Sequence, residues 1–206
     1  MSLIFLSNLI IFVLSIIFFS ANIIYKDKLA KKLNIIDKID KNKIHEQDTS
    51  LNGAFHILFI INLSLLFNYF LNKDFDLLLI VIGVNFFFIL GFLDDKYNLN
   101  ANLKLLISAL FVFFIISISQ NLKLEHLYSE LFSKKYVIKS FSPYFTTLCI
   151  LLLINAVNLA DGINSLVNNI VTIWLINLVL VFGLNLNFSI FVIIFFLILN
   201  SYFIFK

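Results

Sequence analysis

The 206-residue sequence contains one cysteine, one proline, five glycines and no arginine. A lone cysteine, Cys149, cannot form an internal disulfide or a cysteine-type metal site, so we interpret it as a packing residue. No proline-rich linker, internal repeat or second domain is recognisable, which favours a single membrane domain over residues 1–206. Charged residues are also scarce, at 13%, whereas 61% of the residues are hydrophobic. This balance excludes an ordinary soluble domain and indicates an integral membrane protein.

Seven apolar runs approach the length of about 20 residues that a transmembrane helix needs. They lie at residues 3–24, 54–71, 77–93, 103–119, 144–160, 166–183 and 187–205. The first run is too long for the core of a signal peptide and lacks a small-residue cleavage site, so we expect it to remain as an anchor. The sequence therefore predicts an all-α, polytopic bundle of about seven transmembrane helices.

The distribution of lysines predicts the orientation of this bundle, because cytoplasmic loops near membrane spans collect positive charge. With the predicted spans, ten lysines fall on the side of the first loop and five on the other. The N-terminus is therefore expected outside and the first loop in the cytoplasm, as in a multi-pass protein of a bacterial inner membrane.

Three polar stretches lie at membrane boundaries on the predicted cytoplasmic side, where ionisable residues are costly and usually functional. They read DKIDKNKIHEQDTSLNGAF (37–55), GFLDDKYNLNANLK (91–104) and NAVNLADGINSL (155–166). In the second, Asp94 and Asp95 lie about 100° apart on a helix, so one can bind a metal while the other accepts a proton. The alternative is that both acids only flank or cap the next helix.

The third stretch carries a polar stripe at helical spacing. Asn155, Asn158, Gly162 and Ser165 recur at i, i+3, i+7 and i+10, and Asp161 projects beside them. Amides and a carboxylate at a membrane face suit a sugar, a pyrophosphate or a hydrated cation. The alternative interpretation is hydrogen bonding between helices, for which membrane asparagines are well suited.

The three motifs together resemble glycosyltransferase family 4, the polyprenyl-phosphate N-acetylhexosamine-1-phosphate transferases. The family includes enzymes that begin O-antigen, enterobacterial common antigen and teichoic acid linkage synthesis, and the phospho-N-acetylmuramoyl-pentapeptide translocase of peptidoglycan synthesis. GFLDD with Leu99 and Lys104, followed two spans later by NAVNLADGINSL, carries the resemblance. The first loop resembles a family stretch, D-x-P-x-x-R-K-x-H followed by Gly-Gly. Its matching residues are Asp37, Lys43, His45 and Gly53, and the departures are Ile39, Asn42 and Ala54, with Ser108 at a later position where Gln is common.

The resemblance implies transfer of a sugar 1-phosphate, GlcNAc-1-phosphate, from a UDP-sugar to a polyprenyl phosphate in the cytoplasmic leaflet. This reaction releases UMP, initiates cell-envelope polysaccharide synthesis such as that of lipopolysaccharide, and uses Mg²⁺. The short loop after Asp95 favours GlcNAc over the muropeptide. The implied catalytic and metal-binding residues are Asp94, Asp95 and Asp161. The implied substrate-binding residues are Lys43, His45, Lys104, Asn155 and Asn158. A homodimer is compatible with the resemblance, and no nucleic acid partner is expected.

The resemblance covers residues 37 to about 205 and corresponds to the N-terminal two thirds of the family fold. In the family, a G-D motif with a magnesium-binding Asp and a His-rich loop follow the segment that FLILNSYFIFK resembles. We therefore also consider a truncated or split member that is catalytically incompetent alone, and expect little transfer activity without the missing part. A small transporter is the third alternative, but its polar groups would lie at the membrane midplane rather than at one face.

Overall fold

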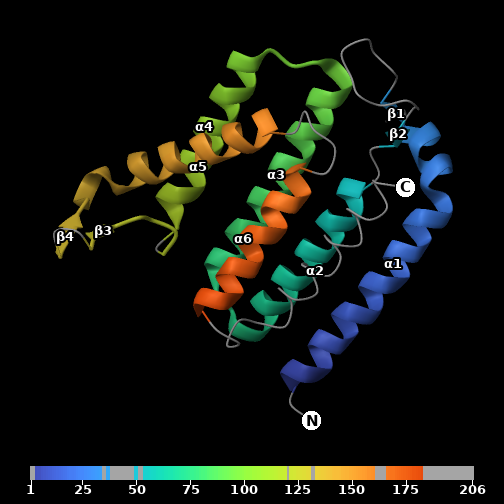
Figure 1. The fold of residues 1–206 in the computed structure, drawn as a ribbon, viewed down its shortest axis with the longest axis horizontal. Helices are drawn as coiled ribbons and strands as arrows, with labels where there is room; N and C mark the ends of the chain where they lie inside the picture. Colours follow the sequence, from blue (N-terminus) through green and yellow to red (C-terminus); the bar gives the residue numbers. More distant parts are fainter. Residues whose placement is uncertain are drawn as a thin grey trace. The chain divides into compact units, whose positions relative to one another are not determined.

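The computed structural model describes residues 3–33, 36–37, 49–50, 53–119, 121–130, 133–160 and 166–182. Figure 1 shows the order of the elements along the chain. The helices are α1 (Leu3–Leu33), α2 (Gly53–Asn72), α3 (Phe75–Tyr97), α4 (Ala101–Ile118), α5 (Ser142–Ala160) and α6 (Leu166–Phe182), with a 3₁₀ helix η1 (Lys139–Phe141). The strands are β1 (Ile36–Asp37), β2 (Thr49–Ser50), β3 (His126–Ser129) and β4 (Lys134–Val137). The chain divides into two compact units, one formed by Met1–Phe67 with Leu159–Lys206 and the other by Asn68–Asn158.

Four of the described helices are long and apolar enough to cross a membrane. These candidate spans are Ala54–Asn72, Phe75–Tyr97, Ala101–Ile118 and Lys139–Leu159. They coincide with the second to fifth predicted spans and confirm a multi-pass, helical membrane protein. The first predicted span lies within the longer helix α1, whose described apolar segment is Leu9–Tyr25. The sixth corresponds to the 17-residue helix α6, and the seventh lies outside the described residues.

The fold is helical, but it contains two short antiparallel hairpins that the sequence analysis did not predict. β1 pairs with β2 over two residues, and β3 pairs with β4 over four. Strands this short carry too few residues for a recognisable alternation of apolar and polar side chains. The sequence pattern therefore gives no sign of them.

In the first unit, α1 and α2 pack through a small apolar core. Ile11 and Ile60 are each 1% exposed and form its centre. His56 is also buried, and its ring centroid lies 4.7 Å from that of Phe19 and 6.2 Å from that of Phe18. No sequence motif surrounds His56, so the sequence alone does not indicate its role. The structure assigns it to the α1–α2 packing, which the sequence could not reveal because it depends on which face of α1 meets α2.

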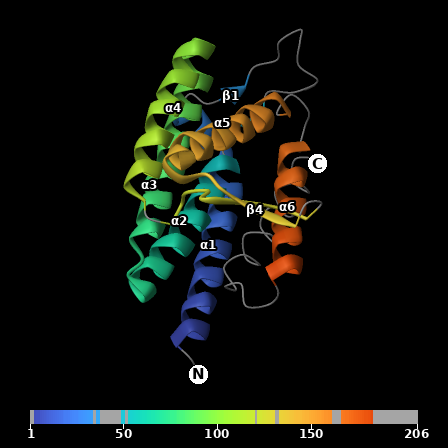
Figure 2. The ribbon, with the colours of Figure 1, turned by 90° about the vertical axis from the view of Figure 1, so that its left-hand side faces the viewer.

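In the second unit, α3 and α4 run side by side, as Figures 1 and 2 show. The Phe86 and Phe111 rings stack between them with centroids 3.6 Å apart and planes 8° from parallel.

The turn between α3 and α4 is determined by the local sequence. Asn98 ends α3 in the left-handed region at φ 49°, and its N–H donates to the Asp94 carbonyl. Asn100 then caps α4 by accepting from the Asn102 N–H at 3.0 Å. The two asparagines, Asn98 and Asn100, thus stabilise a tight turn between the two helices.

The opposite end of the α3–α4 pair is held by a buried acid. Asp76 lies in the first turn of α3 and is 7% exposed. Its Oδ1 accepts a hydrogen bond from Ser119 Oγ and its Oδ2 accepts one from Asn121 Nδ2, each at 2.7 Å. Ser119 Oγ also accepts from the Leu122 N–H at 2.8 Å. The start of α3 is therefore tied to the residues that follow α4, a contact between positions 43 and 45 residues apart.

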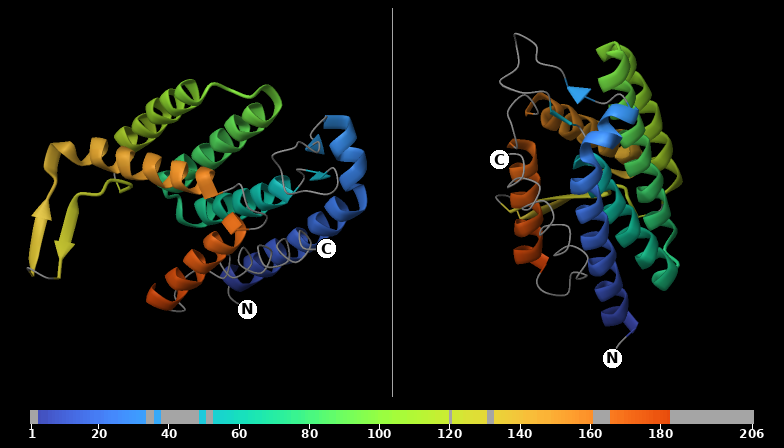
Figure 3. Two further views of the ribbon diagram at one scale, coloured as in Figure 1. Left: turned by 45° about the horizontal axis from the view of Figure 1, so that its top comes forward. Right: turned by 90° about the vertical axis from the view of Figure 1, so that its right-hand side faces the viewer.

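The β3–β4 hairpin connects α4 to α5 and projects beyond the start of α5, as the left view of Figure 3 shows. Its base is fixed on α5 by two hydrogen bonds. The Leu124 N–H donates to Thr146 Oγ1 at 2.8 Å, and Ser142 Oγ donates to the Leu124 carbonyl at 2.9 Å. The Ile138 N–H also donates to the Glu125 carbonyl at 2.9 Å. The hairpin is therefore anchored to α5 at its base.

Candidate functional site

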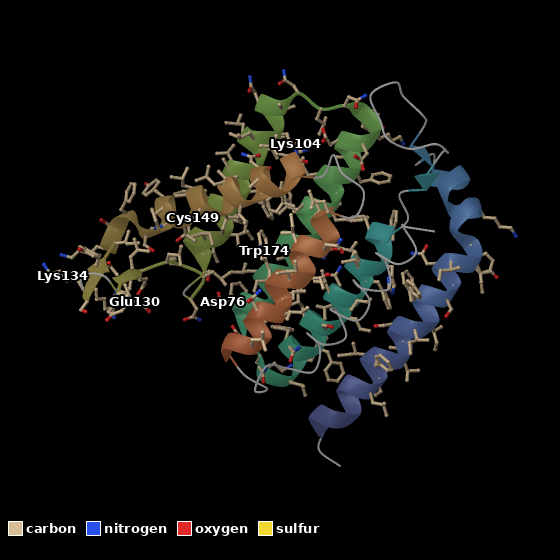
Figure 4. The ribbon with its side chains drawn as sticks, in the orientation of Figure 1. Asp76, Lys104, Glu130, Lys134, Cys149 and Trp174 are labelled. Carbon is tan, nitrogen blue, oxygen red and sulfur yellow. The ribbon has the colours of Figure 1, made fainter. Side chains whose placement is uncertain are left out.

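An ion pair crosses the turn between α3 and α4. Lys104 Nζ, in the first turn of α4, donates to Asp94 Oδ2, in the last turns of α3. The two side chains are 25% and 27% exposed, so the pair is neither buried nor fully solvated. The asparagine-capped turn brings these residues together although ten positions separate them. Figure 4 shows Lys104 beside this turn.

Asp95 has different surroundings from Asp94, although the two acids are adjacent. Asp94 is partly buried and pairs with Lys104, and Asp95 is the more exposed of the two acids. The offset of about 100° between consecutive helical positions explains this difference. Lys104 thus holds one carboxylate at the end of α3, and the other carboxylate lies at the surface.

The two amides of the third motif lie on α5. Asn155 and Asn158 are both exposed and lie near the C-terminal end of this helix. Their spacing of three residues places them on one helical face. In the part of the chain that the structure describes, no hydrogen bond or ion pair joins either amide to Asp94 or Lys104. The structure therefore brings Asp94 and Lys104 into contact, but not these asparagines.

Other predicted site residues lie outside the described part of the chain. Lys43, His45 and Asp161 belong to this group. Asp37 lies in β1 and Gly53 is the first residue of α2. The shared metal-binding role implied for Asp161 and the paired acids on α3 therefore remains a prediction.

The sequence analysis missed the direct contact between Asp94 and Lys104. The resemblance implied substrate binding for Lys104 and catalysis and metal binding for Asp94, without linking the two residues. A signal for the contact was present in KYNLNAN, where two asparagines at helix-capping positions predict a tight turn. A tight turn places the last turn of one helix beside the first turn of the next.

The described residues fit a magnesium ion only in part. Among them, no group of three or more His, Cys, Asp or Glu side chains is placed to hold a metal. Mg²⁺, however, commonly takes one or two carboxylates and completes its shell with water and phosphate oxygens. Asp94 and Asp95 provide two adjacent carboxylates at the end of α3, and Lys104 lies beside Asp94.

The chain matches known proteins over most of its length. Residues 77–205, more than half of the chain, match Glycosyl transferase family 4. A probable undecaprenyl-phosphate N-acetylglucosaminyl 1-phosphate transferase from Bacillus subtilis (strain 168) is 26% identical over 139 residues, covering 68% of this chain and 38% of the relative. A phospho-N-acetylmuramoyl-pentapeptide-transferase from Petrotoga mobilis (strain DSM 10674 / SJ95) is 32% identical over 162 residues, covering 72% of this chain and 50% of the relative.

No solved structure gives a significant match to the chain. The chain spans half or less of the length of these two curated relatives. The family match nevertheless includes most of α3, with its paired acids, the capped turn, Lys104 on α4, and the asparagines of α5. Because the family model matches more than half of its residues, the chain belongs to glycosyl transferase family 4.

Proposed function

We propose that this protein transfers GlcNAc-1-phosphate from UDP-GlcNAc to a polyprenyl phosphate in the cytoplasmic leaflet, and thereby initiates cell-envelope polysaccharide synthesis. The observation that carries the proposal is the Asp94–Lys104 ion pair with Asp95 exposed beside it, at the end of a candidate span. A lipid phosphate lies at this depth of the membrane, where the hydrocarbon meets the headgroups. Family membership supplies the reaction class.

Charge neutralisation and positioning dominate phosphoryl transfer, and the residues of this site suit both tasks. Lys104 offers positive charge to a phosphate and holds Asp94 in a fixed place. Asp95, exposed at the same helix end, is proposed to orient or deprotonate the lipid phosphate. Asp94 and Asp95 would hold Mg²⁺, which supplies Lewis-acid stabilisation of phosphate charge when bound. Asp161 is proposed as a further ligand, and Asn155 and Asn158 as contacts to the nucleotide sugar, with Lys43 and His45 near its phosphates.

The orientation of the site is part of the proposal. With the seven predicted spans, the lysine distribution supports an N-terminus outside and the α3–α4 turn in the cytoplasm. Single-cysteine labelling in intact cells tests this, on a Cys149→Ser background. A cysteine at Asn98 should resist membrane-impermeant reagents until the cells are opened. Labelling of this position from outside would contradict the orientation and the access of the site to a cytoplasmic nucleotide sugar.

The test of the reaction is release of UMP from UDP-GlcNAc, with undecaprenyl phosphate and Mg²⁺ in detergent. Because the chain spans half or less of its relatives, it is assayed alone and with the unmatched part of the Bacillus subtilis relative as a separate chain. Asp95→Asn should abolish UMP release. Asp74→Asn is the matched control, since it neutralises an exposed acid at the other end of α3 and Asn still caps the helix. Equal loss in both variants would contradict the proposed site.

The same assay identifies the sugar. UDP-GlcNAc and UDP-MurNAc-pentapeptide are compared as donors, because the two curated relatives are named for these two kinds of sugar. The short link between Asp95 and α4 supports GlcNAc, since it leaves little chain with which to contact a large peptide-bearing donor. Turnover with the muropeptide alone would contradict this choice of substrate.

A further inference from the structure

The β3–β4 hairpin exposes apolar side chains on both of its faces. Leu127 lies opposite Tyr136, and they are 44% and 49% exposed. On the other face Tyr128 lies opposite Lys135, and Val137 lies opposite His126. An isolated two-stranded hairpin is marginally stable in water at best. The hairpin therefore needs a neighbour that covers apolar surface.

The position of the hairpin in the chain favours the membrane as that neighbour. One candidate span ends at Ile118 and the next begins at Lys139, so both ends of the connection lie at one bilayer surface. The headgroup region on each side of the hydrocarbon is only about 5–8 Å deep, judged from the total and hydrocarbon thicknesses of a bilayer. A four-residue strand is about 13 Å long, so an upright hairpin would leave this region. A hairpin lying along the surface would keep its aromatic side chains within it, where Tyr is enriched.

The two faces of the hairpin differ in their cross-strand pairs. The face with Leu127 and Tyr136 pairs two large uncharged side chains with each other, and its one lysine, Lys134, lies in another pair, opposite Ser129. On the other face, each large side chain is opposed by an ionisable one, namely Lys135 or His126. Burial of a charged group in hydrocarbon is costly. The uncharged Leu127–Tyr136 pair is therefore the better side to turn toward the acyl chains.

The charges around the hairpin complement an anionic lipid surface. The sequence from Asn121 to Ser142 holds four lysines and two glutamates. Lys134 and Lys139 are exposed, and among the described residues neither forms an ion pair. Figure 4 shows Lys134 and Glu130 at the far end of the hairpin. Long lysine side chains at a membrane surface can extend to the phosphates while their stems cover apolar surface.

We propose that the β3–β4 hairpin lies along the bilayer surface as a lipid anchor, with Leu127 and Tyr136 toward the acyl chains and Lys134 and Lys139 on anionic phospholipid headgroups. The base of the hairpin is fixed on α5 through Leu124, Ser142 and Thr146. Lipid contact would therefore orient α5, the helix that carries Asn155 and Asn158 at its other end. The anchor does not depend on the proposed transferase activity.

Tryptophan fluorescence in lipid nanodiscs tests this inference. Trp174 is the only tryptophan of the chain, so a Trp174→Phe background is dark. Tyr136→Trp reports the proposed lipid face, and Tyr128→Trp, on the opposite face, is the matched control. Brominated phospholipid should quench Tyr136→Trp more than Tyr128→Trp, iodide should do the reverse, and the emission of Tyr136→Trp should lie at shorter wavelength. Circular dichroism checks that both variants fold.

Four outcomes would overturn the inference. Equal iodide quenching of both variants without an effect of brominated lipid would place the hairpin in water. Stronger lipid quenching of Tyr128→Trp would reverse the assigned face. Resistance of Tyr136→Trp to both quenchers, relieved on dilution into excess lipid, would indicate that a second copy covers the face. If brominated lipid quenches Tyr136→Trp equally in discs with and without phosphatidylglycerol, the proposed contact of Lys134 and Lys139 with anionic headgroups is wrong.

A second probe guards against an effect of the tryptophan itself. Ser129 lies on the Leu127 face opposite Lys134. A nitroxide attached at Ser129→Cys in a Cys149→Ser background should collide more with oxygen than with a water-soluble nickel complex. The same label at Lys135→Cys, on the other face, should show the opposite preference. Equal collision profiles would contradict the face assignment independently of fluorescence.

Discussion

Replacing Lys104 with glutamine removes the ion pair with Asp94 without shortening the side chain greatly. Both partners are about a quarter exposed, so water screens the interaction. Exposed or partly exposed ion pairs typically contribute about 0–1 kcal/mol, and we expect the free energy of unfolding to fall by no more than about 1 kcal/mol. If the pair is only structural, this small loss is the whole effect of the substitution.

The expected effect on the reaction is much larger. A cationic donor aimed at charge that develops in a transition state is typically worth about 10²–10³-fold in rate. If Lys104 stabilises phosphate charge, Lys104→Gln should lower UMP release by a factor of this order. Lys104→Arg should recover part of the activity, because it keeps the charge but changes the geometry of the donors.

Thermal unfolding in detergent and the UMP assay are measured on the same preparations. Lys96→Gln is the matched control, because Lys96 is exposed in the last turn of α3 and lies over the Tyr97 ring rather than on Asp94. It should leave the activity close to that of the parent chain. A Lys104→Gln variant that unfolds at a much lower temperature but keeps its turnover would refute the reasoning, as would equal losses of activity in the two glutamine variants.

Three further predictions concern the acids and caps of α3 and α4. Asp95→Asn should lower UMP release more than Asp94→Asn if the exposed carboxylate acts on the lipid phosphate, and equal rates would contradict separate roles. Asp76→Ala removes two hydrogen bonds to a carboxylate, each worth about 1.5–3 kcal/mol, so thermal unfolding should show a larger loss than with Ser119→Ala. Asn100→Ala should cost about 1 kcal/mol by removing the α4 cap, and unchanged unfolding would argue against that cap.

The membrane character and four of the predicted spans were determined by the sequence alone. Long apolar runs must form helices in a bilayer, because their backbone groups find no water with which to hydrogen-bond. The acids and Lys104 were also recognised as site candidates, since charged residues at a membrane boundary stand out from such runs. Local capping chemistry in KYNLNAN contained enough information to predict the turn that joins Asp94 to Lys104.

Only the tertiary structure decided which polar residues meet across the fold. The Asp76–Ser119–Asn121 contacts and the burial of His56 each depend on how two helices pack, and the apolar faces of these helices are too uniform to specify that packing. The pairing register of β3 and β4 likewise decided that Tyr136 shares a face with Leu127 and Tyr128 does not. Sequence position alone cannot supply such pairings, because a shift of one residue in register would exchange the two faces.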